Sequence, residues 1–489
     1  MTSAAPSPQR LVLRNTLISL AGQIVATPLS ILVSAVTGRY LGAADFGQMY
    51  LAWQVASFGF LLVEWGHGSV LQARVARDRS AAGELLGTTL AWRCGAALVV
   101  YGLLAVGSLA LRYPGEFQTT LTLVSVQLLL VTLANACQDT ARGFERTDVS
   151  AYAQVAQPIV NLLIVVPTLL LGGGLRAVLT AQAVASAVLL AFVWTARRSV
   201  GVGRLSASLA TLKIYARQGA PFLLFGFAML LQPNVDAILL SKLAPSEVVG
   251  WHAAARKLIN PLIMPVGMLT AALYPTLARL HTEDVRAFRD MVRGALRGAV
   301  ILAVPIALCC ALYREVGILI FSRESYGPAQ ANLLALSPFL FLLFFSMPLG
   351  TSILSSGRER AWAGVQLLCV VVSSVLDPLL IPWFQARTGN GGLGVCVASV
   401  VSEVLMVGGG VWLAVDGLFD RSFAKSVART LAAGAAMTAV ALLLARLSPW
   451  LAAPVALATY FGSLWAIGGL DQAQIEIVRG ALARRLRRR

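Results

Sequence analysis

Ionisable side chains inside otherwise apolar runs are the first candidates for chemistry in this sequence. A charged or titratable group is costly in hydrocarbon, so it is expected to face a cavity or a partner of opposite charge. Arg93 and Arg297 stand about two turns inside their runs. The residues deeper within the runs are Glu64, His67, Asp236, Arg256, Lys257, Asp377 and Glu403. Side chains of these types can bind a charged group, carry a proton or pair with one another.

A functional and a structural explanation stand side by side for most of these residues. Glu64 and His67 are three positions apart and are expected on one helix face, where they suit proton coupling or a helix–helix hydrogen bond. Asp236 suits coupling or gating, or it neutralises Arg256 or Lys257 as a structural ion pair.

The remaining candidates are more easily explained by structure. Arg93 and Arg297 suit a cleft, but they can also extend their charges toward the inner interface. Asp377 directly precedes Pro378, where it can serve the backbone group that the proline frees. Glu403 lies near serines in its run, which favours an interhelical hydrogen bond.

Several kinds of site are absent from the sequence. No GxxxxGK[ST] segment occurs, so no nucleotide loop of that kind powers transport. The three histidines, His67, His252 and His281, are scattered and lack metal-ligand spacing. All six cysteines fall inside apolar runs without a CxxC pair, which is typical of packing. We expect no catalytic residue, no metal and no cofactor.

The composition is that of a polytopic helical membrane protein. Hydrophobic residues make up 57% of the chain, charged residues 12%, and the mean hydropathy is +0.76. A soluble domain carries about 25% charged residues. Apolar runs of about 20 residues match the thickness of a bilayer core. About fourteen spans are predicted, at 15–38, 47–70, 87–111, 117–140, 149–172, 175–196, 218–241, 248–276, 294–320, 329–355, 361–384, 393–415, 427–446 and 450–470.

The net charge of +17 is explained by topology. Lys and Arg concentrate in alternate connections, and the positive-inside rule then places both termini in the cytoplasm. A nucleic-acid partner is therefore not expected. The tail Ala481–Arg489 is rich in arginine and is expected to bind anionic membrane lipid. The connections Leu205–Gln218 and Val285–Gly298 are amphipathic, and each is either an interfacial helix or an extension of the following span.

An internal repeat divides the chain into two comparable halves. The turn Gly38–Gly47 returns as Ser241–Gly250, with Lys242 in the place of Arg39 and Gly250 in the place of Gly47. RGFER after the fourth span likewise corresponds to SGRER after the tenth. We therefore predict a six-helix bundle in 1–200, a second in 201–420, and two further helices with a basic cytoplasmic tail in 421–489.

The repeat also predicts how the halves are related. Six spans per unit start both units on the same side of the membrane, so the two bundles are related by a pseudo-twofold axis along the membrane normal. Transporters built in this way bind substrate between the bundles and work by alternating access. The glycines of the turn Gly38–Gly47 are expected to permit a tight reversal between the first two spans.

Together these segments resemble the Wzx-type flippases, the polysaccharide exporter branch of the multidrug/oligosaccharidyl-lipid/polysaccharide (MOP) superfamily. The resemblance rests on GRYLGAADFGQMYLAWQV, NVDAILLSKLAPSEVVGWHAAARKL, RGFERTD and SGRERAW, and on the plan of twelve plus two spans. Asp236 matches an acidic residue that this branch tends to carry in its seventh span, although Ala237 stands where an arginine is common.

The resemblance implies a flippase without enzymatic activity in the bacterial plasma (inner) membrane. Its substrate would be an isoprenoid-diphosphate-linked oligosaccharide for cell-surface polysaccharide, handed on to polymerase or ligase machinery. Such an anionic diphosphate needs cationic groups in a partly desolvated cleft, a role that fits Arg93, Arg256, Lys257 and Arg297.

Two other functions remain open at this stage. A cation-coupled multidrug exporter of the same superfamily would concentrate acidic residues in its cleft. A membrane glycosyltransferase or polysaccharide polymerase would need a large outer loop, and the outer loops here are short.

Overall fold

A computed structural model describes residues 8–321 and 323–469, and within these ranges every regular element is a helix. The predicted basic tail Ala481–Arg489 lies outside the described residues. The helices are α1 (Pro8–Glu64), α2 (His67–Arg77), α3 (Ala82–Ala110), α4 (Gly115–Gly143), α5 (Thr147–Leu170), α6 (Leu175–Val200), α7 (Leu209–Leu243), α8 (Ser246–Ile259), η1 (Asn260–Ile263), α9 (Met264–Glu283), α10 (Val285–Leu312), α11 (Arg314–Leu319), α12 (Arg323–Tyr326), α13 (Ala329–Ser355), α14 (Glu359–Thr388), α15 (Gly392–Leu413), α16 (Arg421–Leu443) and α17 (Pro449–Ala466).

The prediction of an all-helical membrane protein is confirmed. Among the described residues, 11 helical segments are long and apolar enough to cross a membrane. The first of them, Gly22–Arg77, covers most of the first two predicted spans, and α7 and α17 coincide with two more. Each predicted span therefore falls mainly on helical residues, although 47–70 and 248–276 cross boundaries between helices.

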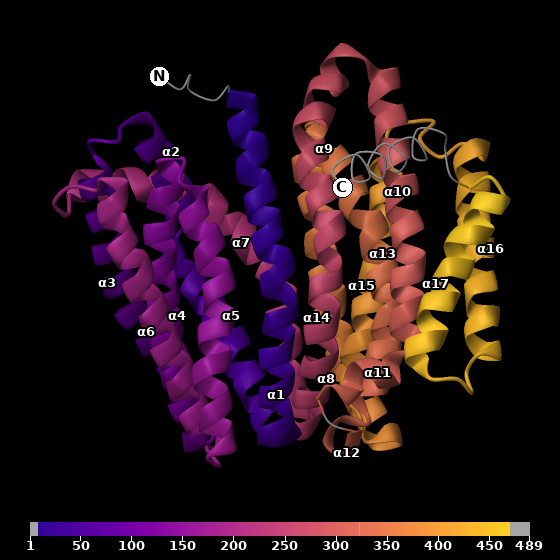
Figure 1. Cartoon of the computed structure of the whole chain (residues 1–489), viewed down its shortest axis with the longest axis horizontal. Helices are drawn as coiled ribbons and strands as arrows, with labels where there is room; N and C mark the ends of the chain where they lie inside the picture. Colours follow the sequence, from indigo (N-terminus) through magenta and orange to yellow (C-terminus); the bar gives the residue numbers. More distant parts are fainter. Residues whose placement is uncertain (1–7, 322, 470–489) are drawn as a thin grey trace, which may run out of the picture. The chain divides into compact units, whose positions relative to one another are not determined.

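The first two predicted spans are separated by a kink within α1 rather than by a loop. Gly42 has φ 80° and ψ 172°, which are not helical values, while the residues on either side continue the helix. A positive φ is readily adopted only by glycine, so the turn Gly38–Gly47 reverses the chain at this residue. Figure 1 shows α1 descending from the N-terminal end and the chain returning to α2.

The residues divide into two compact units. The first unit holds Met1–Lys257, Ile320–Gly327 and Ile381–Gly392, and the second holds Leu258–Leu319, Pro328–Leu380 and Leu393–Arg489. This grouping describes how the helices pack, and the repeat-based bundles 1–200, 201–420 and 421–489 stay a prediction.

α4 is the central helix of the first unit. It packs against α1, α2, α3, α5 and α6 (Figure 1). Of the most apolar stretch of α4, 56% is buried inside the protein, whereas the corresponding value for α3 is 22%. α3 therefore turns much of its apolar surface outward, where lipid is expected to cover it.

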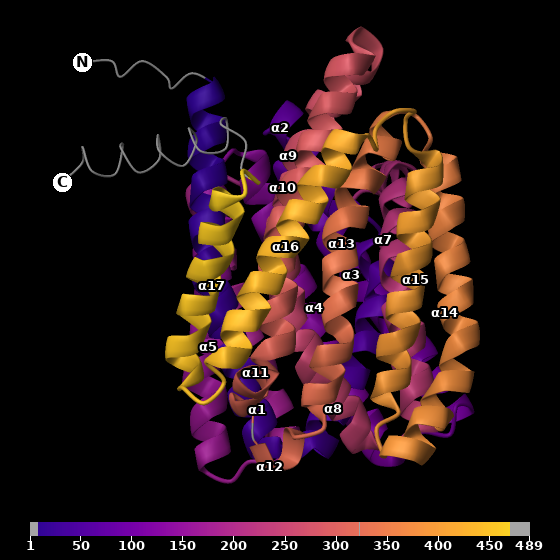
Figure 2. The same cartoon turned by 90° about the vertical axis from the view of Figure 1, so that its right-hand side faces the viewer.

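The second unit is built around α10 and α13. α10 packs against α13 and α16, and α16 packs along α17, as Figure 2 shows. The indole of Trp362 in α14 fills the space above Gly350 of α13 and Gly410 of α15. α7 and α10 begin within the two amphipathic connections and continue into spans, so the extension alternative is the correct one.

The turn Gly38–Gly47 and its repeat partner meet at their glycines, within the first unit. An ideal Cβ on Gly47 would lie 2.2 Å from the carbonyl oxygen of Ser246, and one on Gly250 would lie 1.9 Å from that of Ala43. No side chain fits at such distances, so both positions require glycine at this crossing. The two turns that identify the repeat are thus also in close backbone contact.

Candidate functional site

The helix of the second predicted span is broken between its two polar candidates, Glu64 and His67. α1 ends at Glu64 and α2 begins at His67, while Trp65 and Gly66 have φ values of 44° and 66°. An ideal Cβ on Gly66 would lie 2.6 Å from the carbonyl oxygen of Gly219. The Trp65 indole N–H also donates to the Ala216 carbonyl at 3.1 Å. α7 therefore packs directly against this break.

The break corrects one expectation. Glu64 and His67 do not share one face of a continuous helix, because the left-handed residues between them redirect the chain. The cause is tertiary packing against α7, which a spacing of three positions does not reveal. Non-helical backbone at membrane depth is tolerated where protein buries it or where it lines a cavity.

Arg93 lies in a cluster of charges next to this break. Its side chain projects from α3 and is 1% exposed, and its guanidinium donates to the Thr132 carbonyl in α4. Among the described residues it forms no direct ion pair, but the carboxylates of Glu64 and Asp139 act on it electrostatically. A buried cation is stable only when opposite charge and hydrogen bonds compensate its lost hydration.

Asp139 connects this charge cluster to α2 and to the end of α4. Its Oδ1 lies 3.1 Å from Nη1 of Arg142, and the Arg142 Nε donates to Ser150 in α5 at 2.9 Å. An ideal Cβ on Gly68 would lie 2.6 Å from Asp139 Oδ2, so the carboxylate packs against the backbone of α2. Sequence reasoning missed Asp139, although an acidic residue just inside the end of 117–140 was a usable signal.

His67 is fully buried among aromatic rings. Its ring centroid lies 5.7 Å from that of Trp92 and 4.9 Å from that of Tyr215. The charge of Arg93 also acts on the His67 ring electrostatically. Neither ring nitrogen has a hydrogen-bond partner among the described residues. A histidine placed between a cation and aromatic rings is suited to respond to a change in the local charge.

The other candidates of the first unit lie in α7 and α8. Asp236 and His252 are buried, Arg256 is half-buried and Lys257 is exposed. Arg256 acts electrostatically on His252. Arg93 interacts electrostatically with Glu64 and His67, so we group it with these two residues.

The second unit holds Arg297, Asp377 and Glu403. Nη2 of Arg297 donates to Ser422 Oγ at 2.6 Å, and its charge acts on Asp420. Glu403 in α15 accepts a hydrogen bond from Ser346 in α13, in line with an interhelical role. Asp377 is fully buried in α14. No group of three or more His, Cys, Asp or Glu within 8–321 and 323–469 is arranged to hold a metal ion.

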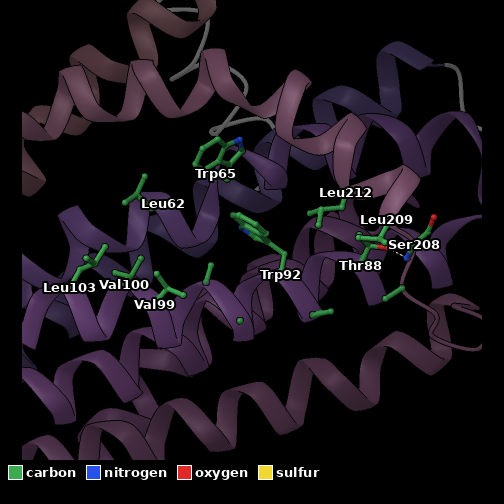
Figure 3. A pocket seen from close by; sticks show the side chains of 14 residues that line it. Leu62, Trp65, Thr88, Trp92, Val99, Val100, Leu103, Ser208, Leu209 and Leu212 are labelled. Carbon is green, nitrogen blue, oxygen red and sulfur yellow. Dashed lines mark hydrogen bonds between the residues drawn. The ribbon is translucent and has the colours of Figure 1, made fainter.

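An apolar groove is lined in part by Trp92, the ring that also packs against His67. It has a volume of about 520 Å³ and runs between the end of α1, the outer face of α3 and the start of α7. Figure 3 shows the rings of Trp65 and Trp92 at its middle. Thr88 and Ser208 lie at one end and are joined by a hydrogen bond of 3.0 Å, and Val99, Val100 and Leu103 lie at the other.

Comparisons with known proteins agree with this architecture. The model of the polysaccharide biosynthesis protein family matches residues 12–281. The lipid II flippase MurJ in an inward closed conformation is similar in structure, with a TM-score of 0.69 and 11% sequence identity over 92% of this chain and 98% of that one. A comparison with curated proteins gives no match.

Multidrug transporters of the MATE family share the same architecture. An inward-facing multidrug resistance MATE family transporter of the MOP superfamily gives a TM-score of 0.62 at 17% identity, over 81% of this chain and 97% of that one. A variant of the Vibrio cholerae MATE transporter VcmN gives 0.53 at 15% identity, over 82% and 96%. At such low identities these likenesses establish the fold alone.

Proposed function

This chain belongs to the polysaccharide biosynthesis protein family, and on that premise we propose that it is a flippase for an isoprenoid-diphosphate-linked oligosaccharide. Its family and fold are those of MOP-superfamily transporters or flippases rather than of enzymes. The oligosaccharide would cross the bacterial plasma membrane by alternating access, with N- and C-termini in the cytoplasm. Polymerase or ligase machinery would then use it for cell-surface polysaccharide.

The broken second span carries the mechanistic part of the proposal. Its repeat counterpart, the eighth span, contains a 3-10 turn, η1 (Asn260–Ile263), between α8 and α9, and the residues that flank this turn keep a right-handed helical backbone. Discontinuous spans mark binding and gating regions in transporters. Glu64, His67, Arg93 and Asp139 at the break in the second span form the proposed coupling site, to which Asp236 of α7 contributes as a gating residue.

Arg256 and Lys257 are the proposed diphosphate ligands of the first unit. They lie in the last turn of α8, before η1, and Lys257 is exposed while Arg256 is half-buried. A guanidinium and an ammonium that are accessible but partly desolvated suit a polyanionic headgroup. Arg297 remains a proposed cationic ligand from the second unit.

A cation-coupled multidrug exporter is the second candidate function. The observation that favours it is the pair of carboxylates, Glu64 and Asp139, close to Arg93 in the first unit. Protonation of such a group would release Arg93 from charge compensation, and a drug exporter can use that change for coupling.

Deletion of the gene separates these functions. Lipid-linked repeat units are measured in each leaflet of the plasma membrane, and sensitivity to cationic drugs is measured in parallel. The flippase proposal expects glycolipid to accumulate on the inner leaflet with unchanged drug sensitivity. Lost drug resistance without glycolipid accumulation would establish the exporter instead.

Complementation of the deletion tests the cationic ligands. Arg256→Ala and Lys257→Ala are each expected to lower glycolipid export about tenfold, because one charge-assisted contact contributes about 1.5–3 kcal/mol. Arg112→Ala, outside the predicted spans, is the control and should retain export. Wild-type export by all three variants at equal expression would reject the diphosphate role.

A further inference from the structure

We propose that the apolar groove beside Trp65 and Trp92 holds the polyprenyl chain of the lipid-linked substrate. This inference rests on the proposed flippase function and deepens it, since it assigns a separate site to the lipid part of the substrate. The chain would lie along α3 when the substrate arrives, with the diphosphate at the basic end of the groove before it reaches Arg256 and Lys257.

The groove has the size and lining of a site for an extended hydrocarbon. Its volume of about 520 Å³ falls within the range of roughly 300–1,000 Å³ that is usual for ligand sites. The rings of Trp65 and Trp92, with centroids 5.8 Å apart, form its middle, and small residues such as Gly95 keep it open. Almost all of its lining is apolar, so water has few partners there.

The position of the groove favours a lipid over a soluble ligand. It opens along the face of α3 on which Leu98, Val99, Leu103 and Val106 are between 62% and 74% exposed. α3 is one of the membrane-crossing helices, so this face meets hydrocarbon in the bilayer. A chain can therefore slide into the groove sideways, without leaving the membrane.

Charge at one end of the groove favours a lipid with an anionic head. The lining residues Ser208 and Leu209 lie between the exposed cations Arg204 and Lys213. The nearby carboxylate of Glu84 is engaged, since it accepts a hydrogen bond of 2.6 Å from Thr211. A diphosphate lying here would meet positive charge while its chain follows the groove past the two indoles.

The groove adjoins the proposed coupling site, which favours the polyprenyl chain of the substrate over a bulk phospholipid as the occupant of the groove. Trp92 lines the groove and also packs against His67. Its indole N–H is fixed by the Val63 carbonyl at 3.1 Å, just before the break at Trp65. A chain in the groove would thus press on the residues that surround the break, which links the arrival of substrate to the coupling site.

Photocrosslinking tests this assignment on the full chain in nanodiscs. One probe is a polyprenyl diphosphate with a photoreactive group on its chain, and the other is phosphatidylglycerol with the same group on an acyl chain. The polyprenyl probe is expected to label peptides covering 88–103 and 207–212. Gly95→Phe fills the groove and should lower this labelling at least tenfold. Gly107→Phe is the matched control, because Gly107 also lies in open space on α3 but outside the groove, and this variant should leave the labelling unchanged.

Either of two results would overturn the groove assignment. One is equal or stronger labelling of the same peptides by the phosphatidylglycerol probe, which would make the groove a phospholipid site. The other is polyprenyl labelling that survives Gly95→Phe and, should that variant misfold, Val99→Trp. The leaflet assay after gene deletion does not depend on the groove, so a failed groove leaves the flippase function standing, and a failed leaflet assay rejects that function by itself.

Discussion

Arg93 and Arg297 occupy matching positions in the two halves of the sequence, but their surroundings differ. Arg93 is 1% exposed, bonds to the Thr132 carbonyl and has Glu64 and Asp139 as charged neighbours. Arg297 is half-buried and bonds to Ser422, close to Asp420. The first is part of a membrane-embedded charge cluster, whereas the second contacts the start of a helix.

The side chains around Arg93 and Arg297 come from different parts of the chain, and this explains why the surroundings of the two arginines differ. Glu64 and Asp139 belong to spans of the first half, and the break at Trp65 and Gly66 brings Glu64 to Arg93. Ser422 and Asp420 lie at the start of α16, which follows the duplicated spans. Duplication therefore reproduces the position of a cation, while residues around it decide whether it serves a buried network or a surface contact.

Arg93→Met is expected to have the largest effect on stability. It removes a buried guanidinium that donates to the Thr132 carbonyl and that interacts electrostatically with Glu64 and Asp139, and losing a hydrogen bond of a charged group costs about 1.5–3 kcal/mol. The free energy of unfolding in micelles, measured by denaturant titration, should fall by that amount. Export should be lost as well.

A second substitution separates charge from packing at Arg93. Adding Glu64→Gln to Arg93→Met also removes the carboxylate with the largest electrostatic effect on Arg93, and should recover part of the lost stability, because removing two opposite charges together costs less than removing one alone. If Arg93→Met unfolds no more readily than the wild type, the charge cluster does not stabilise the first unit and the comparison with Arg297 fails.

Gly66→Ala is expected to have the next largest effect. The φ of 66° and the distance of 2.6 Å from an ideal Cβ to the Gly219 carbonyl both oppose a side chain. Strain of this kind costs about 1–3 kcal/mol. Gly298→Ala, beside Arg297 in uninterrupted α10 with nothing within 4 Å, is the matched control and should be neutral or stabilising by up to about 1 kcal/mol. Equal destabilisation by both would mean that the break is not rigidly held.

Arg93 also shows how far the sequence predicts such a site. The apolar runs predicted the helices, because each run is long enough to cross the hydrocarbon core of a bilayer as a helix. They did not predict the break at Gly66, since its cause is the packing of α7 against the backbone from a distant part of the chain. For the same reason Glu64 and His67 were expected on one face, and Asp139 was not recognised as a neighbour of Arg93.

Arg297→Met should change stability little. The guanidinium is half-buried and solvent-accessible, and its contact with Ser422 is of the kind that contributes about 1 kcal/mol or less. The change in the free energy of unfolding is measured by the same denaturant titration as for Arg93→Met. A loss as large as that of Arg93→Met would show that the two arginines are equivalent after all, and that the second unit has a buried charge network of its own.

Asp420→Asn is expected to have the smallest effect, and only a pH-dependent one. The hydrogen bond from the Phe423 N–H, together with the charges of Arg293 and Arg297, lowers the pKa of Asp420 below its usual value. A lowered pKa in the folded state means that the carboxylate stabilises the fold at neutral pH and that this contribution is lost as pH falls below about 4. Asn also caps a helix well, so the substitution removes charge and little else. Thermal unfolding between pH 7 and pH 3.5 should therefore show a slightly smaller loss of stability for Asp420→Asn than for the wild type. Identical pH profiles would mean that the charge of Asp420 does not contribute to the surroundings of Arg297.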